Sequence, residues 1–416
     1  MRFLPDREQR AFAASLDAML SRADTPAVVR EWSRGEHAVG RALWARLAGA
    51  GVFSLAAGEE AGGVGVRPVE LALAFVELGR HAVPGPLVET VTAALLLPDA
   101  KLTERLVTGE TMATVAHTGT PPADTGAGTG PGTGAGAGPG TRTGAPRTEP
   151  GTSGDGPCTG VGTRPGTPGD GTGTADTGPG TPGANPDTEP GTPGANPGTP
   201  NTEPRTPRAN PDTPGTEPHT GPYALDGDAA GLWLALTPAG LFRCSGHGPV
   251  RRSLDLARRL TALEGPEPLP LGPSAARAVP LARLVTAAQA LGVGQALLDR
   301  TVEHVRRRTQ FGVPVGSFQA VKHRLADAEV ALAFARPLVL GAALTLAPAE
   351  VAAAKAAACE AAYATARTAL QLHGAIGYTA ECDLSLWLTK ARALRTAWGS
   401  PEECRAAVLG AGDRRW

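Results

Sequence analysis

Two short stretches in the C-terminal third of the chain combine residue types that suit phosphate groups. The first reads Arg308-Thr-Gln-Phe-Gly312 and is followed by Phe318-Gln319, and the second reads Gln371-Leu-His-Gly-Ala-Ile-Gly-Tyr378. A fixed guanidinium binds phosphate oxygens, and the backbone N–H groups of a glycine-rich turn do the same because no Cβ blocks their approach. Both stretches therefore carry residue types that suit a phosphate group.

Each of these residues also has an ordinary structural interpretation. Arg308 alone, beside Arg306 and Arg307, is typical of a solvated helix end, and only the downstream Phe-Gly and Gln favour a binding role. His373 is equally suited to capping a helix C-terminus, and Gly374 to ending that helix. The binding interpretation depends on the two stretches occurring together.

Helices position both stretches. The apolar pattern predicts a long helix over 279–308, a second over about 317–346 and a third, rich in alanine, over about 348–372. A last helix over about 383–395 completes an antiparallel four-helix bundle. The first stretch then follows the first helix, and the second follows the third.

Other element types precede the bundle. Residues 5–98 are helical in pattern, and β-like pieces at Met112–Ala116, Leu232–Leu236 and Gly240–Cys244 predict a small sheet. Residues 118–221 form a tract of Thr, Gly, Pro, Ala and Asn with almost no large apolar side chain. We expect this tract to be disordered, because it cannot offset the backbone entropy lost on ordering.

The expected fold class is mainly α with a small β-domain. We predict an N-terminal helical domain over 1–105 and a C-terminal four-helix bundle over 271–416. Between them, a small truncated β-domain over 106–270 is interrupted by the disordered tract at 118–221.

Composition and charge exclude several classes of function. The formal net charge of −1 provides no clustered basic face for nucleic acid. The five cysteines are scattered without CxxC pairs, which fits a reducing cytoplasm, and no metal site is predicted. No signal core is visible, and no stretch reaches the roughly 18 uncharged apolar residues of a membrane helix. We expect a cytoplasmic protein that binds neither nucleic acid nor membrane.

The order of these zones, together with the motifs, resembles the flavin-dependent acyl-CoA dehydrogenase family. The two stretches described first are similar to the family's Arg-x-x-Phe-Gly with its Gln, and to its Gln-x-x-Gly-Gly-x-Gly-aromatic turn. Further matches to the family's first-domain pattern are Leu43-Trp44, Gly51–Phe53, Gly58–Gly65, Glu77–Gly79 and Pro84–Pro86. The resemblance covers most of the chain outside the tract.

This resemblance implies a cofactor, a reaction and an assembly. In the family the matching motifs contact FAD across a subunit interface. The implied FAD contacts here are Arg308, Phe311, Gln319, Gln371, His373 and Gly374. The implied reaction is the α,β-desaturation, or a related oxidation, of an acyl-CoA or carrier-bound acyl thioester, with the electron acceptor unknown. The implied assembly is a dimer or tetramer of like or unlike chains.

The carboxylate that the family uses as base is absent at both of its usual positions. One position falls on Trp398, within Ala397-Trp-Gly-Ser400, and the other on Ala282, within Leu281–Val285. Neither side chain accepts a proton, although a positioned base commonly contributes about 10²- to 10⁴-fold to the rate. The resemblance therefore leaves the catalytic residue unknown.

Other residues are weaker candidates for the base. Glu402 and Glu403 lie close to the first position, and a shifted loop would deliver one of them, although solvated charges on a terminal turn are the more typical interpretation. Tyr378 is a lesser candidate, and Glu381 is more typical of a structural acid. The family's Thr/Ser-rich flavin-facing strand is also replaced by the tract, which weakens the expectation that FAD is retained.

Three functions therefore remain open. The chain is a flavoenzyme with an unrecognised base, a non-catalytic FAD-contacting subunit of a heteromeric acyl-CoA dehydrogenase, or a flavin-free scaffold of the same fold. The stretch Thr379–Leu384 resembles the heteromeric branch of the family. Bound flavin separates the third function from the others, and co-purifying partners separate the second from the first.

Overall fold

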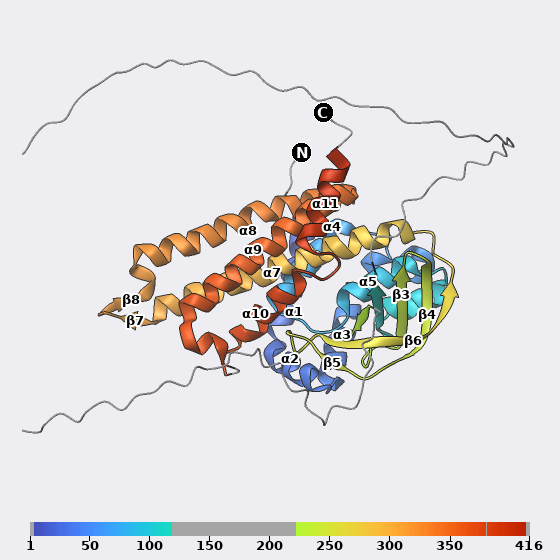
Figure 1. The fold of residues 1–416 in the computed structure, drawn as a ribbon, viewed down its shortest axis with the longest axis horizontal. Coiled ribbons are helices and arrows are strands. Elements are labelled where there is room, and N and C mark those ends of the chain that lie inside the picture. The colour runs from blue at the N-terminus through green and yellow to red at the C-terminus, as the bar shows by residue number, and fades with distance from the viewer. Residues whose placement is uncertain (1–3, 119–221, 380, 413–416) are drawn as a thin grey trace, which may run out of the picture. The chain divides into compact units, whose positions relative to one another are not determined.

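Helices dominate the computed structural model, which describes residues 4–118, 222–379 and 381–412 (Figure 1). Apart from Thr118, the tract predicted to be disordered lies outside these residues. The described residues belong to one compact unit of the chain. The domain boundaries drawn from the sequence therefore stay a prediction, whereas the mainly α fold class with a small sheet is confirmed.

Four long helices form the predicted bundle within a residue or two of the expected bounds. They are α7 (Ala278–Arg307), α8 (Gln319–Thr345), α9 (Pro348–His373) and α10 (Leu384–Leu394). The central helix α7 contacts the other three, and α9 packs closely because its alanines Ala354, Ala358, Ala362 and Ala366 are all buried. Small side chains on successive turns allow such close helix contacts.

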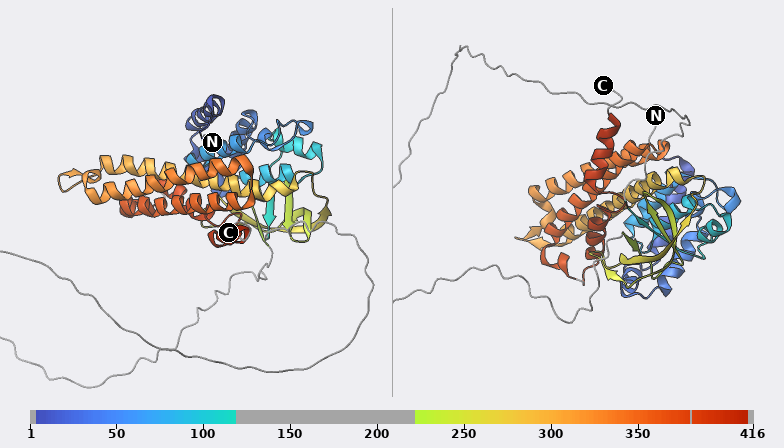
Figure 2. Two further views of the ribbon diagram at one scale, coloured as in Figure 1. Left: turned by 90° about the horizontal axis from the view of Figure 1, so that it is seen from above. Right: turned by 45° about the vertical axis from the view of Figure 1, so that its right-hand side comes forward.

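The N-terminal segment folds into six helices. Their bounds are α1 (Arg7–Ser21), α2 (Thr25–Arg34), α3 (Ala38–Gly49), α4 (Pro68–Arg80), α5 (Leu87–Leu96) and α6 (Ala100–Val107). In both views of Figure 2 these helices and the sheet lie toward the same end of the bundle, away from the short hairpin of β7 (Thr309–Gln310) and β8 (Val313–Pro314).

Helices α4 and α7 meet backbone to backbone. A Cβ added to Gly292 of α7 would lie 1.9 Å from the carbonyl oxygen of Val76, and one added to Gly79 of α4 would lie 2.1 Å from that of Gln289. Each helix therefore contributes one glycine to the contact. This crossing holds the N-terminal helices against the bundle.

The small sheet combines strands from both sides of the tract. Its strands are β1 (Ala113–His117), β2 (Tyr223–Leu225), β3 (Leu232–Thr237), β4 (Gly240–His247), β5 (Arg251–Arg252) and β6 (Arg259–Leu269). The order is β1-β3-β4-β6-β2, with β5 also on β6, and only β1 and β3 pair in parallel. The predicted pieces at 112–116, 232–236 and 240–244 are therefore confirmed as β1, β3 and β4.

The longest strand, β6, was not predicted. Gly265, Pro266 and Pro268 interrupt its sequence pattern, because proline cannot donate a hydrogen bond to a neighbouring strand. The structure accommodates them in the second half of β6, which pairs with β4, whereas β2 and β5 pair with residues 259–262 of the first half. Both prolines thus lie where one strand edge has no partner among the described residues.

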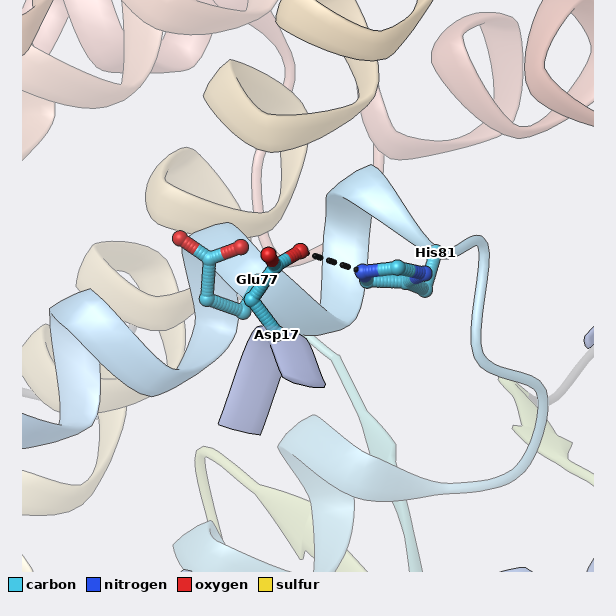
Figure 3. A group of neighbouring side chains, drawn as sticks. All are labelled: Asp17, Glu77 and His81. Atoms are coloured by element: carbon cyan, nitrogen blue, oxygen red, sulfur yellow. Dashed lines mark hydrogen bonds and ion pairs between the residues drawn. The ribbon is translucent and has the colours of Figure 1, made fainter. Parts of the chain in front are cut away.

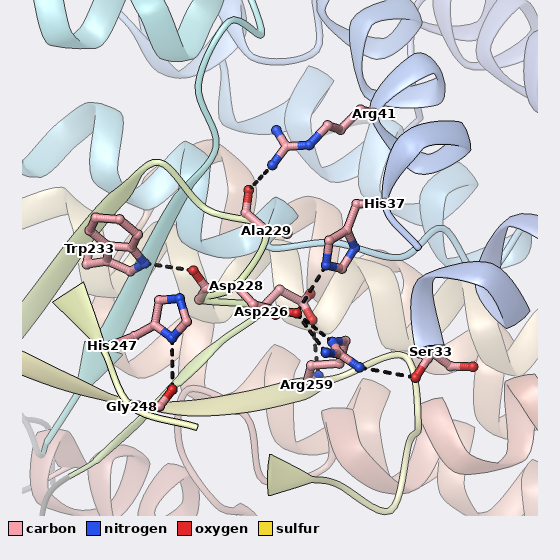
Figure 4. Close-up of polar contacts among 11 residues, drawn as sticks. Ser33, His37, Arg41, Asp226, Asp228, Ala229, Trp233, His247, Gly248 and Arg259 are labelled. Atoms are coloured by element: carbon pink, nitrogen blue, oxygen red, sulfur yellow. Dashed lines mark hydrogen bonds and ion pairs between the residues drawn. The ribbon is translucent and has the colours of Figure 1, made fainter. Parts of the chain in front are cut away.

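A cluster of ion pairs and hydrogen bonds joins the N-terminal helices to the sheet (Figure 4). Asp228 Oδ2 lies 2.7 Å from a guanidinium nitrogen of Arg259 and 3.1 Å from His37 Nε2. Arg259 Nη1 also donates to the carbonyl of Ser33 at 3.2 Å. Burial alone would raise the pKa of Asp228, but the hydrogen bonds from His37 and Arg259 outweigh burial and hold that pKa well below its usual range.

Asp226, two residues earlier, has the opposite environment and gives a testable pH dependence. It is fully buried, and burial raises its pKa to about 8, so the folded state keeps a proton that the unfolded chain loses near pH 4. Stability should therefore fall as pH rises from about 4 to about 8 and stay level above that range. We expect Asp226→Asn to remove this fall and to be more stable than the parent at pH 8 by on the order of a few kcal/mol.

Urea unfolding at pH 5 and pH 8 measures this effect. Asp228→Asn is the matched control, because its carboxylate is stabilised in the folded state, and this substitution should destabilise the protein at both pH values. An equal difference between Asp226→Asn and the parent at pH 5 and pH 8 would show that Asp226 titrates normally.

Two helices are long and apolar enough to span a membrane by composition alone, which the sequence-based expectation did not include. In α7 and its preceding turn, 94% of the apolar window is buried inside the protein, as in the core helix of a globular fold. In α8 only 33% of the window is buried. The exposed apolar face of α8 therefore needs another explanation, and the predictions of no membrane contact and of a cytoplasmic location stay untested.

Candidate functional site

The two predicted phosphate-binding stretches are brought together at one end of the bundle. Arg308 follows the last turn of α7, and its Nη1 donates to the carbonyl oxygen of His373, the last residue of α9, at 3.2 Å. Both residues line a cavity of about 550 Å³. We call it the Arg308 pocket; it is lined by Arg300, Glu303, His304, Arg307, Arg308, His373, Ile376, Glu381, Cys382, Asp383 and Leu384.

Cations without a counter-ion dominate the Arg308 pocket. Arg300 and Arg308 form no ion pair among the described residues, whereas Arg307 is paired with Glu303, and Asp383 is paired with a residue of α2. Arg300 lies over the ring of a buried tryptophan of α10, at 3.8 Å from the ring centre. The pocket therefore presents two free guanidinium groups, which suit an anion such as a phosphate.

Two stacked imidazoles form the inner wall of this pocket. The rings of His304 and His373 lie 4.1 Å apart at 21°. Burial lowers the pKa of both, and the positive charge of Arg308 lowers each further. His373 is 4% exposed, and its Nδ1 donates to the carbonyl of Ala369 at 2.8 Å, so its ring is held by its own helix. His373 therefore both caps the end of α9 and lines the Arg308 pocket.

The other implied FAD contacts lie outside the pocket lining. Phe311 is 93% exposed on the β7–β8 turn, Gln319 is the exposed first residue of α8, and Gln371 is exposed on α9. Gln371 accepts a hydrogen bond from Arg324. Gly374 has a left-handed φ of 67°, and open space lies where its Cβ would be. Their contact with FAD across a subunit interface stays a prediction.

The sequence signal for Arg300 and His304 was present but not used. Arg300, His304 and Arg308 are spaced by four residues, so they follow one face of α7 as it leaves the core. A basic stripe of this kind at a helix end indicates an anion site more specifically than one arginine does.

A second cavity, of about 270 Å³, surrounds the position of the missing base. We call it the Trp398 pocket. It lies between α5, α7, the strands β1, β2 and β6 and the loop before α11 (Pro401–Gly412), and it is lined by Glu89, Val115, His117, Tyr223, Leu225, Arg258, Leu260, Arg283, Thr396, Ala397, Trp398, Gly399 and Glu403.

Three contacts hold Trp398 inside this pocket. Its carbonyl accepts from Arg283 Nε at 3.0 Å, and its indole Nε1 donates to Glu89 Oε1 at 3.2 Å. Its ring stacks on His117 with 5.3 Å between ring centres. The φ of Trp398 is 59°, a left-handed conformation that is unfavourable for a bulky side chain. These contacts stabilise that conformation and direct the indole into the space around the family's base position.

Glu89 was missed by the sequence analysis. Its side chain is 4% exposed, its Oε2 has no hydrogen-bond partner, and burial raises its pKa. It is the single charged residue of helix α5, whose other residues are apolar or threonine. A lone acid in an apolar run was the available signal, since acids are almost never buried without a specific environment.

The weaker base candidates have other contacts. Glu403 lines the Trp398 pocket, but its Oε2 accepts from the Ser400 backbone N–H at 2.6 Å while its own N–H donates to Ser400 Oγ at 3.1 Å. This capping box begins α11, a helix that the sequence analysis treated as a terminal turn. Glu402 is exposed, and Ala282 is fully buried outside the pocket. Glu381 is exposed at the Arg308 pocket, and the side chain of Tyr378 is not among those described.

One group of side chains has the types and spacing of metal ligands (Figure 3). It consists of Asp17, Glu77 and His81, whose ligand atoms lie within 4.8 Å of one another. His81 Nε2 is already 2.8 Å from Asp17 Oδ1, and Glu77 Oε2 is 3.5 Å from Arg80 Nη1. These bonds join α1 to the end of α4. The prediction that the chain has no metal site stays a prediction.

Family models match both helical parts of the chain. The model described as acyl-CoA dehydrogenase, N-terminal domain, matches residues 6–98, and the model described as acyl-CoA dehydrogenase, C-terminal domain, matches residues 273–410. Together these ranges cover more than half of the sequence.

Curated relatives match over part of their length. The chain is 38% identical over 183 residues to acyl-CoA dehydrogenase IpdE2 of Mycobacterium tuberculosis, which is 44% of this chain and 57% of that protein. It is 37% identical over 132 residues to 3-sulfinopropanoyl-CoA desulfinase of Paraburkholderia xenovorans, covering 31% of this chain and 34% of that one. The chain thus spans about half the length or less of these relatives.

Solved structures share the fold over their whole length. The ChsE4-ChsE5 complex from Mycobacterium tuberculosis matches with a TM-score of 0.66 at 21% identity, covering all of both chains. Butyryl-CoA dehydrogenase from Megasphaera elsdenii matches with a TM-score of 0.66 at 17% identity, covering 99% of each chain. From the two domain matches and this shared architecture, the chain belongs to the acyl-CoA dehydrogenase family of FAD-dependent flavoproteins.

Proposed function

We propose that this chain is the subunit without a base in a heteromeric, FAD-dependent acyl-CoA dehydrogenase, and that the assembly desaturates an acyl-CoA or carrier-bound acyl thioester. One observation carries the proposal. Trp398 fills the space around the family's base position, while the Arg308 pocket keeps its free cations. The chain has lost the group that does chemistry and kept groups that bind phosphate.

The phosphate part of FAD fits the Arg308 pocket. Arg300 and Arg308 offer guanidinium groups that form no ion pair among the described residues, and the open space at Gly374 admits a phosphate close to the backbone. His304 Nε2 is buried without a hydrogen-bond partner, so a ligand polar group would satisfy it. These residues would bind the pyrophosphate of an FAD that spans a chain–chain contact.

The flavin ring does not fit the Trp398 pocket of this chain. Trp398 and His117 stack on each other there, and the cavity of about 270 Å³ that remains is lined mainly by polar and charged groups. A planar ring would need the space that the indole occupies. No chemical step is therefore assigned to this pocket, and when FAD is bound it supplies the hydride acceptor in the partner chain.

The two described carboxylates that line the Trp398 pocket are both held by hydrogen bonds. Glu403 accepts in the capping box, and Glu89 accepts through Oε1 from the indole of Trp398. The first of the three functions left open by the sequence, a flavoenzyme with its own base, is therefore less well supported than a subunit whose partner supplies the carboxylate.

An exposed apolar face is available for the partner. Val330, Phe334 and Leu338 are exposed at four-residue intervals on α8. Phe318, directly before α8, and Phe311, on the β7–β8 turn, are also exposed, with their rings 6.3 Å apart. Apolar patches of this kind mark protein interfaces. A related chain is the proposed occupant. The fold is shared with the ChsE4-ChsE5 complex and with the Tcur3481-Tcur3483 steroid ACAD variant, two assemblies named for unlike chains.

Isolation of the tagged chain from its native cells under non-denaturing conditions tests the proposal. We expect a second family member to co-purify, with an acidic residue at the position that matches Trp398 or Ala282. Desaturation would be assayed with a panel of acyl-CoA thioesters and an artificial electron acceptor. Replacing the partner's acid with its amide should lower the rate by about 10²- to 10⁴-fold.

The isolated chain is the matched control and should turn over no thioester. An active homo-oligomer of this chain would refute the proposal and favour an unrecognised base. A preparation with no flavin absorbance, with or without a partner, would favour the flavin-free scaffold.

A further inference from the structure

We propose that the Trp398 pocket binds a small carboxylate-bearing molecule, held between Arg258, Arg283 and Glu89. This site is separate from the Arg308 pocket, and the inference does not depend on the identity or the presence of a partner chain. It concerns what the chain does with a cavity that the flavin ring does not fit.

Two cations in the pocket have no counter-ion. Arg283 is 8% exposed on α7, and its Nε donates to the carbonyl of Trp398. Arg258, at the start of β6, is half-buried. Neither forms an ion pair among the residues of 4–118, 222–379 and 381–412. A largely buried guanidinium that forms no ion pair is costly, so an anionic ligand between the two would offset that cost.

Glu89 supplies a third polar group. Its Oε1 accepts from Trp398 Nε1, which fixes the carboxyl group, and its Oε2 is buried without a partner. Burial raises its pKa, although the charges of Arg258 and Lys390 oppose the rise. A raised pKa favours the protonated form, in which Oε2 donates to a ligand carboxylate. Without a ligand, this oxygen has no hydrogen bond in the pocket.

The other titratable side chains of the Trp398 pocket have contacts of their own. Glu403, the other carboxylate of the pocket, is engaged in the capping box of α11. His117 presents its ring to Trp398, and its pKa is lowered by burial and by Arg283, so it remains neutral. The pocket therefore offers two guanidinium groups that form no ion pair among the described residues, beside the unpartnered Oε2 of Glu89, and these groups suit an anion.

Size limits the ligand. The cavity of about 270 Å³ holds a molecule of roughly ten non-hydrogen atoms and no more than one carboxylate between the arginines. The carboxylate has two sources, a free short-chain acid or the far end of an acyl thioester that carries an acid group. Their shared chemistry is a carboxylate on a short aliphatic chain.

Calorimetric titration of the full chain, purified with any chains that accompany it, tests the proposal. The probes are succinate, its uncharged analogue succinamide, succinyl-CoA and butyryl-CoA. We expect succinate to bind at least about tenfold more tightly than succinamide, or succinyl-CoA at least about tenfold more tightly than butyryl-CoA. The first pair differs in whether the two acid groups are charged, and the second in whether the acyl chain ends in a carboxylate or a methyl group. Binding of succinate identifies a free acid as the ligand, and binding of succinyl-CoA alone identifies a thioester.

Substitutions locate the binding in the Trp398 pocket. Arg258→Gln and Arg283→Gln should each weaken the carboxylate probe by at least about tenfold, since each removes one charged donor. Arg243→Gln, exposed on β4 outside the pocket, is the matched control and should change nothing. Arg283→Gln loses a hydrogen bond to Trp398 and is the variant more at risk of not folding. Arg258 is half-buried, so Arg258→Gln should fold in either case.

Two outcomes would overturn the inference. One is that succinate binds no more tightly than succinamide and succinyl-CoA no more tightly than butyryl-CoA. The absence of any binding by the four probes has the same meaning. The other is carboxylate binding that survives Arg258→Gln in a folded protein. In either case the proposed function would stand or fall separately, because co-purification and flavin content do not depend on this pocket.

Discussion

Replacing Arg308 with alanine is expected to lower the flavin content of the purified assembly by at least about tenfold. Arg308 is one of two guanidinium groups in its pocket without a carboxylate partner, and charge-assisted bonds to phosphate are among the strongest polar contacts in proteins. Its Nη1 donates only to a backbone carbonyl in the absence of ligand. The ratio of flavin absorbance to protein after gel filtration measures the effect.

Arg306→Ala is the matched control for this experiment. Arg306 lies two residues earlier on the same helix end, is exposed, and does not line the Arg308 pocket. The control should retain its flavin, and both variants should melt at the temperature of the parent. Equal flavin content in Arg308→Ala and Arg306→Ala would mean that the cation of position 308 does not contact the cofactor.

Gly292→Ala is expected to give the largest loss of stability, about 3 kcal/mol or more. The new Cβ would lie 1.9 Å from the carbonyl oxygen of Val76, and that neighbour is backbone, so α4 and α7 would have to separate. Separation opens the buried contact between the N-terminal helices and the bundle. Thermal and urea unfolding measure the change.

Gly410→Ala provides the opposite result for comparison. Gly410 lies within α11 with nothing near its added Cβ, so alanine should stabilise that helix by up to about 1 kcal/mol. If Gly292→Ala behaved like Gly410→Ala, the close approach of α4 and α7 would not exist in the protein.

The bundle helices were predictable because local patterns determine them. They began and ended within a residue or two of the sequence prediction, since their periodic apolar faces and their Gly and Pro boundaries are local signals. The two motifs marked Arg308 and His373 as cofactor contacts across a subunit interface, and the bond between them within one chain was not predicted. A basic stripe on α7 would have added Arg300 and His304 to the same prediction.

The Trp398 pocket was not predictable from local patterns. Its charged groups come from α5, α7, the residue before β6 and the first turn of α11, which are far apart in sequence and meet only in the tertiary structure. The sequence showed that Trp398 replaces the expected acid. It did not show that the indole turns toward Glu89, because that direction depends on a left-handed backbone and on the bond from Arg283. Strand β6 was missed for a similar reason, since its prolines are tolerated only where one strand edge is unpaired.

Native mass spectrometry of the purified assembly, with flavin released and quantified from the same sample, tests the central claim most directly. The claim is that this chain contributes phosphate contacts to an FAD whose ring and base belong to a different chain. The account predicts an assembly of unlike chains with one FAD for each pair. A homo-oligomer that carries one FAD per copy of this chain would contradict it, because each Trp398 pocket would then have to hold a flavin ring.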